Sequence, residues 1–132
     1  MQYESTLDRD QLVDLAIKRY FANVDAKNLD AAMECFHDEA LFCVQSAFVR
    51  HSGKAEIRRM LGDLMDNYEI VVHRDFICTV DEKNGRIAAS FEAVLTAADG
   101  TVTRLHNTNF WRIRGDRFQE VYVYMSGANP LI

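Results

Sequence analysis

The chain has 132 residues, of which 48% are hydrophobic, and it carries a formal net charge of −5. This length is typical of one domain, and this share of apolar residues is enough for one sizeable core, so we expect a single domain over residues 1–132. The negative charge and the absence of basic runs argue against nucleic acid or an anionic membrane as partner, and favour a small molecule or a protein.

Three amphipathic helices are predicted in the first half of the chain. Apolar residues recur at helical spacing from Leu12 to Val24, which indicates the first helix. Asn28 can cap a second helix, which we expect to end near His37. Residues 41–49 are strand-like, and residues 54–67 carry the apolar stripe of a third helix.

Four long strands are predicted in the second half, over residues 68–80, 86–97, 101–114 and 118–125. These segments are rich in β-branched and aromatic residues, and turn pairs such as Asn84-Gly85 separate them. The turns indicate an antiparallel meander. Helices followed by strands predict an α+β domain with three N-terminal helices on the concave face of a curved, mostly antiparallel sheet that can wrap a pocket.

Two amides interrupt the apolar alternation of the third long strand. Asn107 and Asn109 share a strand face with apolar neighbours that include Trp111. A buried amide without a partner costs roughly 1–3 kcal/mol, so the two amides belong either to an internal network or to a wet cavity. We expect a pocket suited to a small ring compound, lined by Tyr20, Asn107, Asn109, Trp111, Val121, Val123 and Met125.

The opposite face of the last strands is aromatic. Tyr122 and Tyr124, and with them Phe118, alternate away from the expected pocket, and Phe110 and His106 lie on the neighbouring strand. A patch of this size is unfavourable in water. We therefore expect a symmetric homodimer through the outer sheet face.

No signal segment or membrane span is predicted. The start, MQYESTLDRD, lacks a cationic and then apolar region, and no apolar run approaches the ~18 residues that cross a bilayer. Cys35, Cys43 and Cys78 have neither an even count nor the close spacing of a zinc site. We expect reduced thiols in a soluble, cytoplasmic protein.

Three segments carry a resemblance to a known superfamily: RYFANVDAKNLDAAMECFHDEA, HSGKAEIRRML and NTNFWRIRGDRFQEVYVYMSG. With them the chain resembles, over nearly its whole length, the nuclear transport factor 2-like superfamily, which includes SnoaL-like polyketide cyclases, ketosteroid isomerase, scytalone dehydratase and hexachlorocyclohexane dehydrochlorinase. The resemblance implies the cone-shaped, cystatin-like, SnoaL-like fold and agrees with a homodimer. It leaves the activity open, because this fold hosts both enzymes and binding modules.

The resemblance to ketosteroid isomerase supplies counterparts for only some of its catalytic residues. It places Tyr20 on the tyrosine that donates to the enolate oxygen, and Asn109 near the partner acid. The isomerase base falls on Val44, which cannot accept a proton. Steroid isomerisation by that mechanism is therefore not expected.

Similarity to the dehydratase and the dehydrochlorinase suggests a different pair. Their shared acid falls on Asp25 and their histidine on His73, so the resemblance implies a proton-transfer dyad that needs neither metal nor cofactor. Two alternatives remain: Asp25 as a turn residue before Asn28, and His73 as a structural strand histidine whose facing depends on a bulge.

The other candidate groups have simpler structural interpretations. His37 suits a helix end, His51 precedes the Ser52-Gly53 turn, and Cys43 suits a small buried apolar site. No histidines have metal-ligand spacing, so no metal site is expected. Two functions stay open: a cofactor-independent lyase or isomerase acting on a small, mostly apolar cyclic molecule, and a non-catalytic ligand-binding or dimerisation module.

Overall fold

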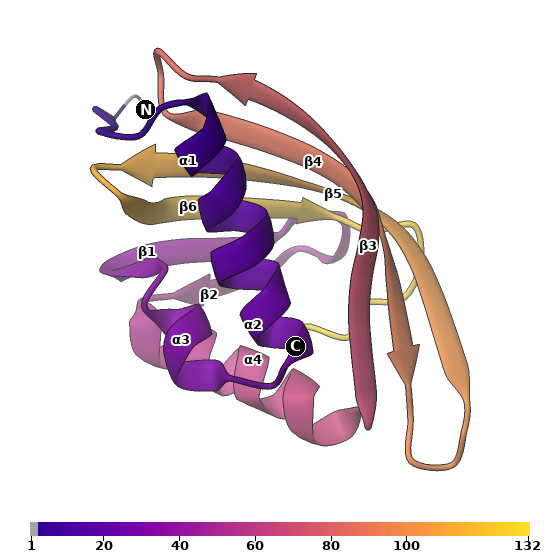
Figure 1. The fold of residues 1–132 in the computed structure, drawn as a ribbon. Coiled ribbons are helices and arrows are strands. Elements are labelled where there is room, and N and C mark those ends of the chain that lie inside the picture. Colours follow the sequence, from indigo (N-terminus) through magenta and orange to yellow (C-terminus); the bar gives the residue numbers. More distant parts are fainter. Residues whose placement is uncertain (1–2) are drawn as a thin grey trace.

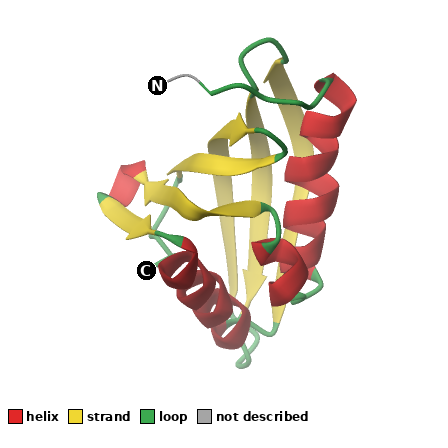
Figure 2. Ribbon diagram, turned by 90° about the vertical axis from the view of Figure 1, so that its left-hand side faces the viewer, coloured by secondary structure: helices red, strands yellow, loops and turns green. Residues whose placement is uncertain are grey.

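The computed structural model describes residues 3–132, which form one curved sheet with the helices gathered on its concave face (Figures 1 and 2). The sheet has six strands in the order β2-β1-β6-β5-β4-β3. The first helix lies along the hollow of the sheet, and α4 lies across its open end. This arrangement confirms the predicted α+β architecture.

The first helix is one continuous helix built from three segments. These are α1 (Arg9–Val13), the π-helical segment η1 (Asp14–Phe21) and α2 (Ala22–Asp25). It begins before Leu12, because Asp8 and Gln11 form a capping box in which each side chain accepts a hydrogen bond from the other residue's backbone N–H at 2.9 Å. The sequence contains this capping pair, but the pair precedes the apolar stripe from which we predicted the helix to begin at Leu12.

The π-helical segment changes which side chains face the sheet. The backbone N–H of Ala22 donates to the carbonyl of Ile17, a spacing of five residues. With this wider spacing the helix buries two neighbouring side chains, Tyr20 and Phe21. A periodicity of 3.6 residues did not predict the burial of Phe21.

The predicted second helix is shorter than expected. Asn28 caps α3 (Leu29–Met33), but the helix stops there, and His37 lies in β1 (Phe36–Val44) rather than at a helix end. The expected strand over residues 41–49 is instead a hairpin of β1 and β2 (Val49–Ser52), joined by the 3-10 turn η2 (Gln45–Ala47). The third helix, α4 (Lys54–Asn67), has the predicted bounds.

The antiparallel meander is confirmed. It consists of β3 (Ile70–Asp81), β4 (Arg86–Thr96), β5 (Val102–Arg114) and β6 (Arg117–Tyr124), each paired with the next. β1 then pairs with β6 in parallel, a long-range pairing that no turn signal predicted. The inner faces of β4 and β5 follow the expected alternation, with Phe91, Leu95, Leu105 and Trp111 buried.

The expected outward position of Phe118 is wrong. β6 has one extra residue opposite β5, since Arg112 pairs with Glu120 while Ile113 pairs with Phe118. This bulge reverses the alternation, so Phe118 is fully buried and its ring stacks on Trp111 at 5.9 Å. Within residues 3–132, no helix is both long and apolar enough to span a bilayer.

Candidate active site

Asp25 and His73 are directly hydrogen-bonded. The Nδ1 atom of His73 lies 2.6 Å from Oδ1 of Asp25, and the backbone N–H of His73 donates to Oδ2 at 2.8 Å. Asp25 is the last residue of α2 and His73 lies near the start of β3. The site therefore joins the end of the first helix to the edge strand of the sheet.

A bulge in β3 decides how His73 faces. Arg74 pairs with Glu92 but Ile77 pairs with Ser90, so β3 has one extra residue, and Asp75 adopts a left-handed φ of 59° there. Before the bulge, His73 shares the inner face with the buried Val71. After it, the inner face continues with Phe76, which stacks on Phe21, while Ile77 is 73% exposed.

Phe21 fixes the plane of the imidazole. The two rings stack with a centroid separation of 4.3 Å and an interplanar angle of 25°. The side chain of His73 is only 10% exposed and that of Asp25 is 23% exposed. The ring thus lies between an apolar face and a carboxylate, which leaves it little freedom to turn.

His73 lines a small internal cavity of about 30 Å³ between the first helix, α4 and the sheet. Five of the residues predicted to line the pocket also line this cavity: Tyr20, Asn107, Asn109, Val123 and Met125. Trp111 and Val121 lie elsewhere in the core. The expected room for a ring compound is absent, because a cavity of roughly 30 Å³ has about the volume of one water molecule.

Two residues that line this cavity, Asn107 and Asn109, have buried polar atoms without a partner. Asn107 is 6% exposed and Asn109 is 3% exposed, and neither Oδ1 atom has a hydrogen-bond partner within the described chain. The Nε1 atom of Trp111, on the same face of β5, is also buried without a partner. Buried polar groups of this kind are costly, and within the described chain no internal network satisfies the two amide oxygens.

Tyr20 lies at the centre of an aromatic cluster. Its ring makes edge contacts with Phe36 and Phe118 at 5.5 Å each and with Trp111 at 6.5 Å. Complete burial, followed by the nearby Cys35 and Asp25, raises the pKa of the Tyr20 hydroxyl far above its ordinary value. Tyr20 therefore stays protonated and able to donate a hydrogen bond.

The remaining histidines lie outside this site or at its rim. His37 bonds through Nε2 to the carbonyl of Arg114 at 2.6 Å, and His106 is exposed on the outer face, as its alternation predicted. His51 is buried, and its Nε2 lies 3.1 Å from the carbonyl of Leu131. Residues 3–132 contain no group of three or more His, Cys, Asp or Glu side chains placed to hold a metal ion.

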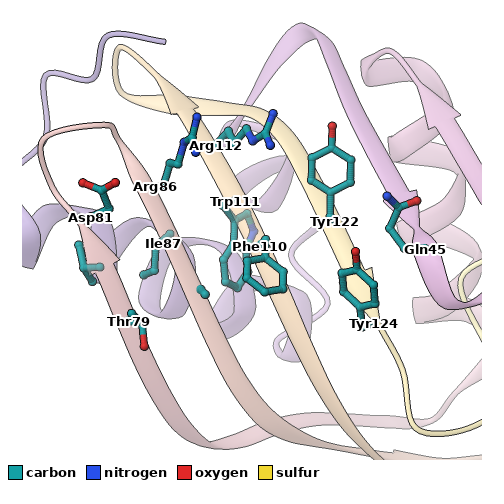
Figure 3. Close-up of a pocket in the computed structure, with 12 residues that line it drawn as sticks. Gln45, Thr79, Asp81, Arg86, Ile87, Phe110, Trp111, Arg112, Tyr122 and Tyr124 are labelled. Carbon is teal, nitrogen blue, oxygen red and sulfur yellow. The ribbon is translucent and has the colours of Figure 1, made fainter. Parts of the chain in front are cut away.

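A second concave region, of about 620 Å³, lies on the outer face of the sheet (Figure 3). Arg112 and Tyr122 stand beside each other there, with the guanidinium 5.4 Å from the ring centroid. Arg112 also lies 3.5 Å from Glu120, and the Tyr122 hydroxyl donates to the same carboxylate. Phe110 and Tyr124 form an edge contact at 5.8 Å and are each nearly half exposed.

Comparison with protein families matches residues 17–121 to the SnoaL-like domain. No curated protein matches the sequence. Among solved structures, a candidate polyketide cyclase from Xanthomonas campestris pv. campestris is 19% identical, with a TM-score of 0.76 over 88% of this chain and 90% of that chain.

Two further structures have the same fold. A candidate isomerase from Bacillus subtilis is 15% identical, with a TM-score of 0.77 over 89% of this chain and 87% of that chain. A protein with a ketosteroid isomerase-like fold from Catenulispora acidiphila, in complex with trimethylamine, is 11% identical, with a TM-score of 0.74 over 89% and 86%. At these identities the likeness establishes the fold alone.

Proposed function

The chain belongs to the SnoaL-like domain family, and from that premise we propose that it is a cofactor-independent lyase or isomerase acting on a small, mostly apolar cyclic molecule. The observation that carries the proposal is the 2.6 Å contact between Asp25 and the ring of His73, at the wall of an internal cavity. The candidate isomerase from Bacillus subtilis is similar in fold and fits the same class of reaction.

The hydrogen bonds favour one tautomer of His73. An ionised carboxylate only accepts hydrogen bonds, so Nδ1 carries the proton and donates it in a hydrogen bond to Asp25, and Nε2 keeps a lone pair. In an elimination, Nε2 takes a proton from a substrate carbon, the C–H electron pair forms the new double bond, and the leaving group departs with its own electron pair. Asp25 stabilises the imidazolium, which then returns the proton to the leaving group or, in an isomerisation, to another carbon.

The amides favour a ligand that has an oxygen substituent. Asn107 and Asn109 line the cavity from the β5 face and each has a buried amide oxygen without a partner, whereas the other lining side chains, such as Phe91 and Leu64, are largely apolar. A hydroxyl or enol group would satisfy the amide oxygens, while the ring of the ligand would contact the apolar walls. A cyclic ketone in equilibrium with its enol, or a hydroxylated ring, has this chemistry.

The test is proton exchange at carbon. The protein is incubated with cyclic ketones in D₂O, and deuterium uptake at the α-carbon is followed by NMR for the wild type and for His73→Ala. The proposal expects stereoselective uptake that the substitution abolishes. Binding of the ketones without any exchange or elimination would contradict it and favour a ligand-binding module.

We also propose that the protein is a homodimer through the outer sheet face. Support comes from the exposed Phe110 and Tyr124 and from the hollow beside them, which contains both Asp81 and Arg112 (Figure 3). A surface that carries both charges can pair with its own copy about a two-fold axis, with unlike charges facing each other. Burial of the two rings would then stabilise the pair.

A further inference from the structure

We propose that the C-terminal segment, residues 126–132, is a removable plug, and that the side chain of Leu131 sets the size of the molecule that the cavity accepts. This inference rests on the cavity being the ligand site of the proposed function. Leu131 is 9% exposed and lines the cavity together with His73 and both amides. The segment leaves the end of β6 and finishes beside α4 in both views of the fold (Figures 1 and 2).

The size of the cavity requires some part of the wall to move. An apolar cavity of roughly 150 Å³ holds benzene, whereas this one has a volume of about 30 Å³. Packed protein interiors are close to crystal density, so small shifts of many side chains do not supply this difference. A large side chain must leave the cavity.

Leu131 is the lining residue best able to leave. Eleven of the thirteen lining residues belong to helices or strands, and the two exceptions are Met125 and Leu131. Met125 directly follows β6, and its backbone N–H donates to the Ser46 hydroxyl at 3.0 Å. Leu131 lies in the segment after β6, where residues 125–132 form no helix or strand, so its displacement disturbs no regular element.

The plug is held by a few side-chain hydrogen bonds. His51 donates from Nε2 to the Leu131 carbonyl at 3.1 Å, and Asn129 closes a local turn by bonding both the N–H and the carbonyl of Leu131. Arg59 donates to the Ile132 carbonyl at 3.1 Å from an exposed position. In the described part of the chain, no backbone-to-backbone hydrogen bond joins residues 126–132 to the sheet or to a helix.

With these contacts the segment has a closed and an open state, and the hydrogen bond from His51 to the Leu131 carbonyl, here called the latch, stabilises the closed state. In the closed state the Leu131 side chain forms part of the cavity wall and His51 holds its carbonyl. In the open state water satisfies these groups and the cavity gains the volume of a leucine side chain. The apparent affinity for a ring compound is then the intrinsic affinity reduced by the open fraction, and loss of the plug removes this penalty.

The first experiment compares Leu131→Ala with Ile132→Ala, its exposed neighbour, as a matched control. Binding of benzene, phenol and indole is measured by NMR titration. We expect Leu131→Ala to bind these probes at least about tenfold more tightly than the wild type, and Ile132→Ala to match the wild type. Equal affinities in all three proteins, or no binding by any of them, would overturn the plug.

The second experiment needs no change in the cavity wall. His51→Leu removes the latch donor, whereas His51→Gln keeps an N–H donor at this place. Hydrogen exchange at the Leu131 amide should accelerate at least about tenfold in His51→Leu, with little change in His51→Gln and none in the amides of β4. Exchange at Leu131 as slow as in β4, in every variant, would show that the segment does not open.

Failure of the plug and failure of the enzyme proposal are separable. Probe binding requires no proton transfer, so Leu131→Ala should keep its tighter binding when combined with Asp25→Asn. Tighter binding without any turnover would leave the plug standing and remove the lyase or isomerase. If Leu131→Ala turned over substrates with the same preference for ring size as the wild type, the lyase or isomerase would stand and the plug would be removed.

Discussion

Asp25 accepts two hydrogen bonds from His73, one from the ring at 2.6 Å and one from the backbone N–H at 2.8 Å. The same carboxylate therefore orients the imidazole and fixes the strand that carries it. A residue that only capped the turn between α2 and α3 would not reach β3. Both carboxylate oxygens of Asp25 instead accept hydrogen bonds from His73, which is 48 positions away in the sequence.

The dyad is tested by Asp25→Asn, which keeps the volume of the side chain and removes its charge. The amide keeps one oxygen that can accept from His73 and places an NH2 group, which only donates, in the other position, so it stabilises an imidazolium poorly. Any elimination or isomerisation rate should fall at least about 100-fold, the usual scale of acid–base assistance, and His73→Ala should lose no less. Steady-state kinetics measure the loss, and circular dichroism checks the fold.

Asp30→Asn is the matched control for this prediction. Asp30 is an exposed acid of the next helix, paired with Arg58, so its substitution changes the net charge equally without touching the site. Activity in Asp30→Asn should equal that of the wild type. Full activity in Asp25→Asn would remove the dyad.

The amides are tested by Asn109→Leu. The substitution removes a buried polar atom that has no partner, so the free energy of unfolding in urea should stay equal or rise by about 1 kcal/mol. Affinity for phenol should fall toward that for benzene, because the hydroxyl partner is lost. A loss of stability of about 2 kcal/mol or more would instead indicate a structural network around Asn109.

Sequence periodicity predicted the strands well and failed where a strand has an extra residue. The alternation of β4 and β5 placed the Phe91 and Asn107 side chains correctly on the inner face. In β3 and in β6 a one-residue bulge reverses the alternation of side chains. In β3, the residues after Asp75 therefore face the opposite side of the sheet from the one that strict alternation predicts. In β6, the bulge turns Phe118 inward. Bulges depend on cross-strand register, which single-strand patterns do not contain.

The site was accessible to sequence reasoning only in part. Resemblance, rather than local chemistry, singled out Asp25 and His73, because an acid in a helical link and a strand histidine are each common. Phe21 escaped notice because π-helical spacing changes the buried face. The cavity size depends on Leu131, in a segment without regular structure, whose long-range contacts no periodicity predicts.

The outer face contains a carboxylate whose charge should stabilise the fold. Burial disfavours ionised Glu120, but hydrogen bonds from Tyr122 and Tyr3 and the charge of Arg112 outweigh it, so the pKa of Glu120 lies below its ordinary value. This stabilisation is present above the unfolded-state pKa of about 4.3 and is lost as pH falls through the lower folded-state pKa.

Glu120→Gln tests that stabilisation. At pH 7 the variant should unfold with a free energy lower than the wild type by about 1 kcal/mol, the usual size of such hydrogen bonds, and the difference should shrink below about pH 4. Tyr122→Phe should show the same trend, since burial and the nearby Glu120 raise the pKa of Tyr122 to about 12 and the hydroxyl donates throughout this range. A difference independent of pH would exclude ionised Glu120 as the cause.

The proposed dimer is tested best by Tyr124→Asp. Tyr124 is 47% exposed and contacts Phe110, so a charge there should block the pairing of two sheets at little cost to the monomer. Tyr122→Asp should also dissociate the dimer, but it is a poorer choice because the Tyr122 hydroxyl bonds to Glu120 within the same chain.

Ala22→Asp adds the same charge on the exposed side of α2 and is the control. Light scattering at micromolar concentration should report a dimer for the wild type and the control, and a monomer for Tyr124→Asp. A monomeric wild type would remove the dimer and leave the exposed rings of Phe110 and Tyr124 as an ordinary surface.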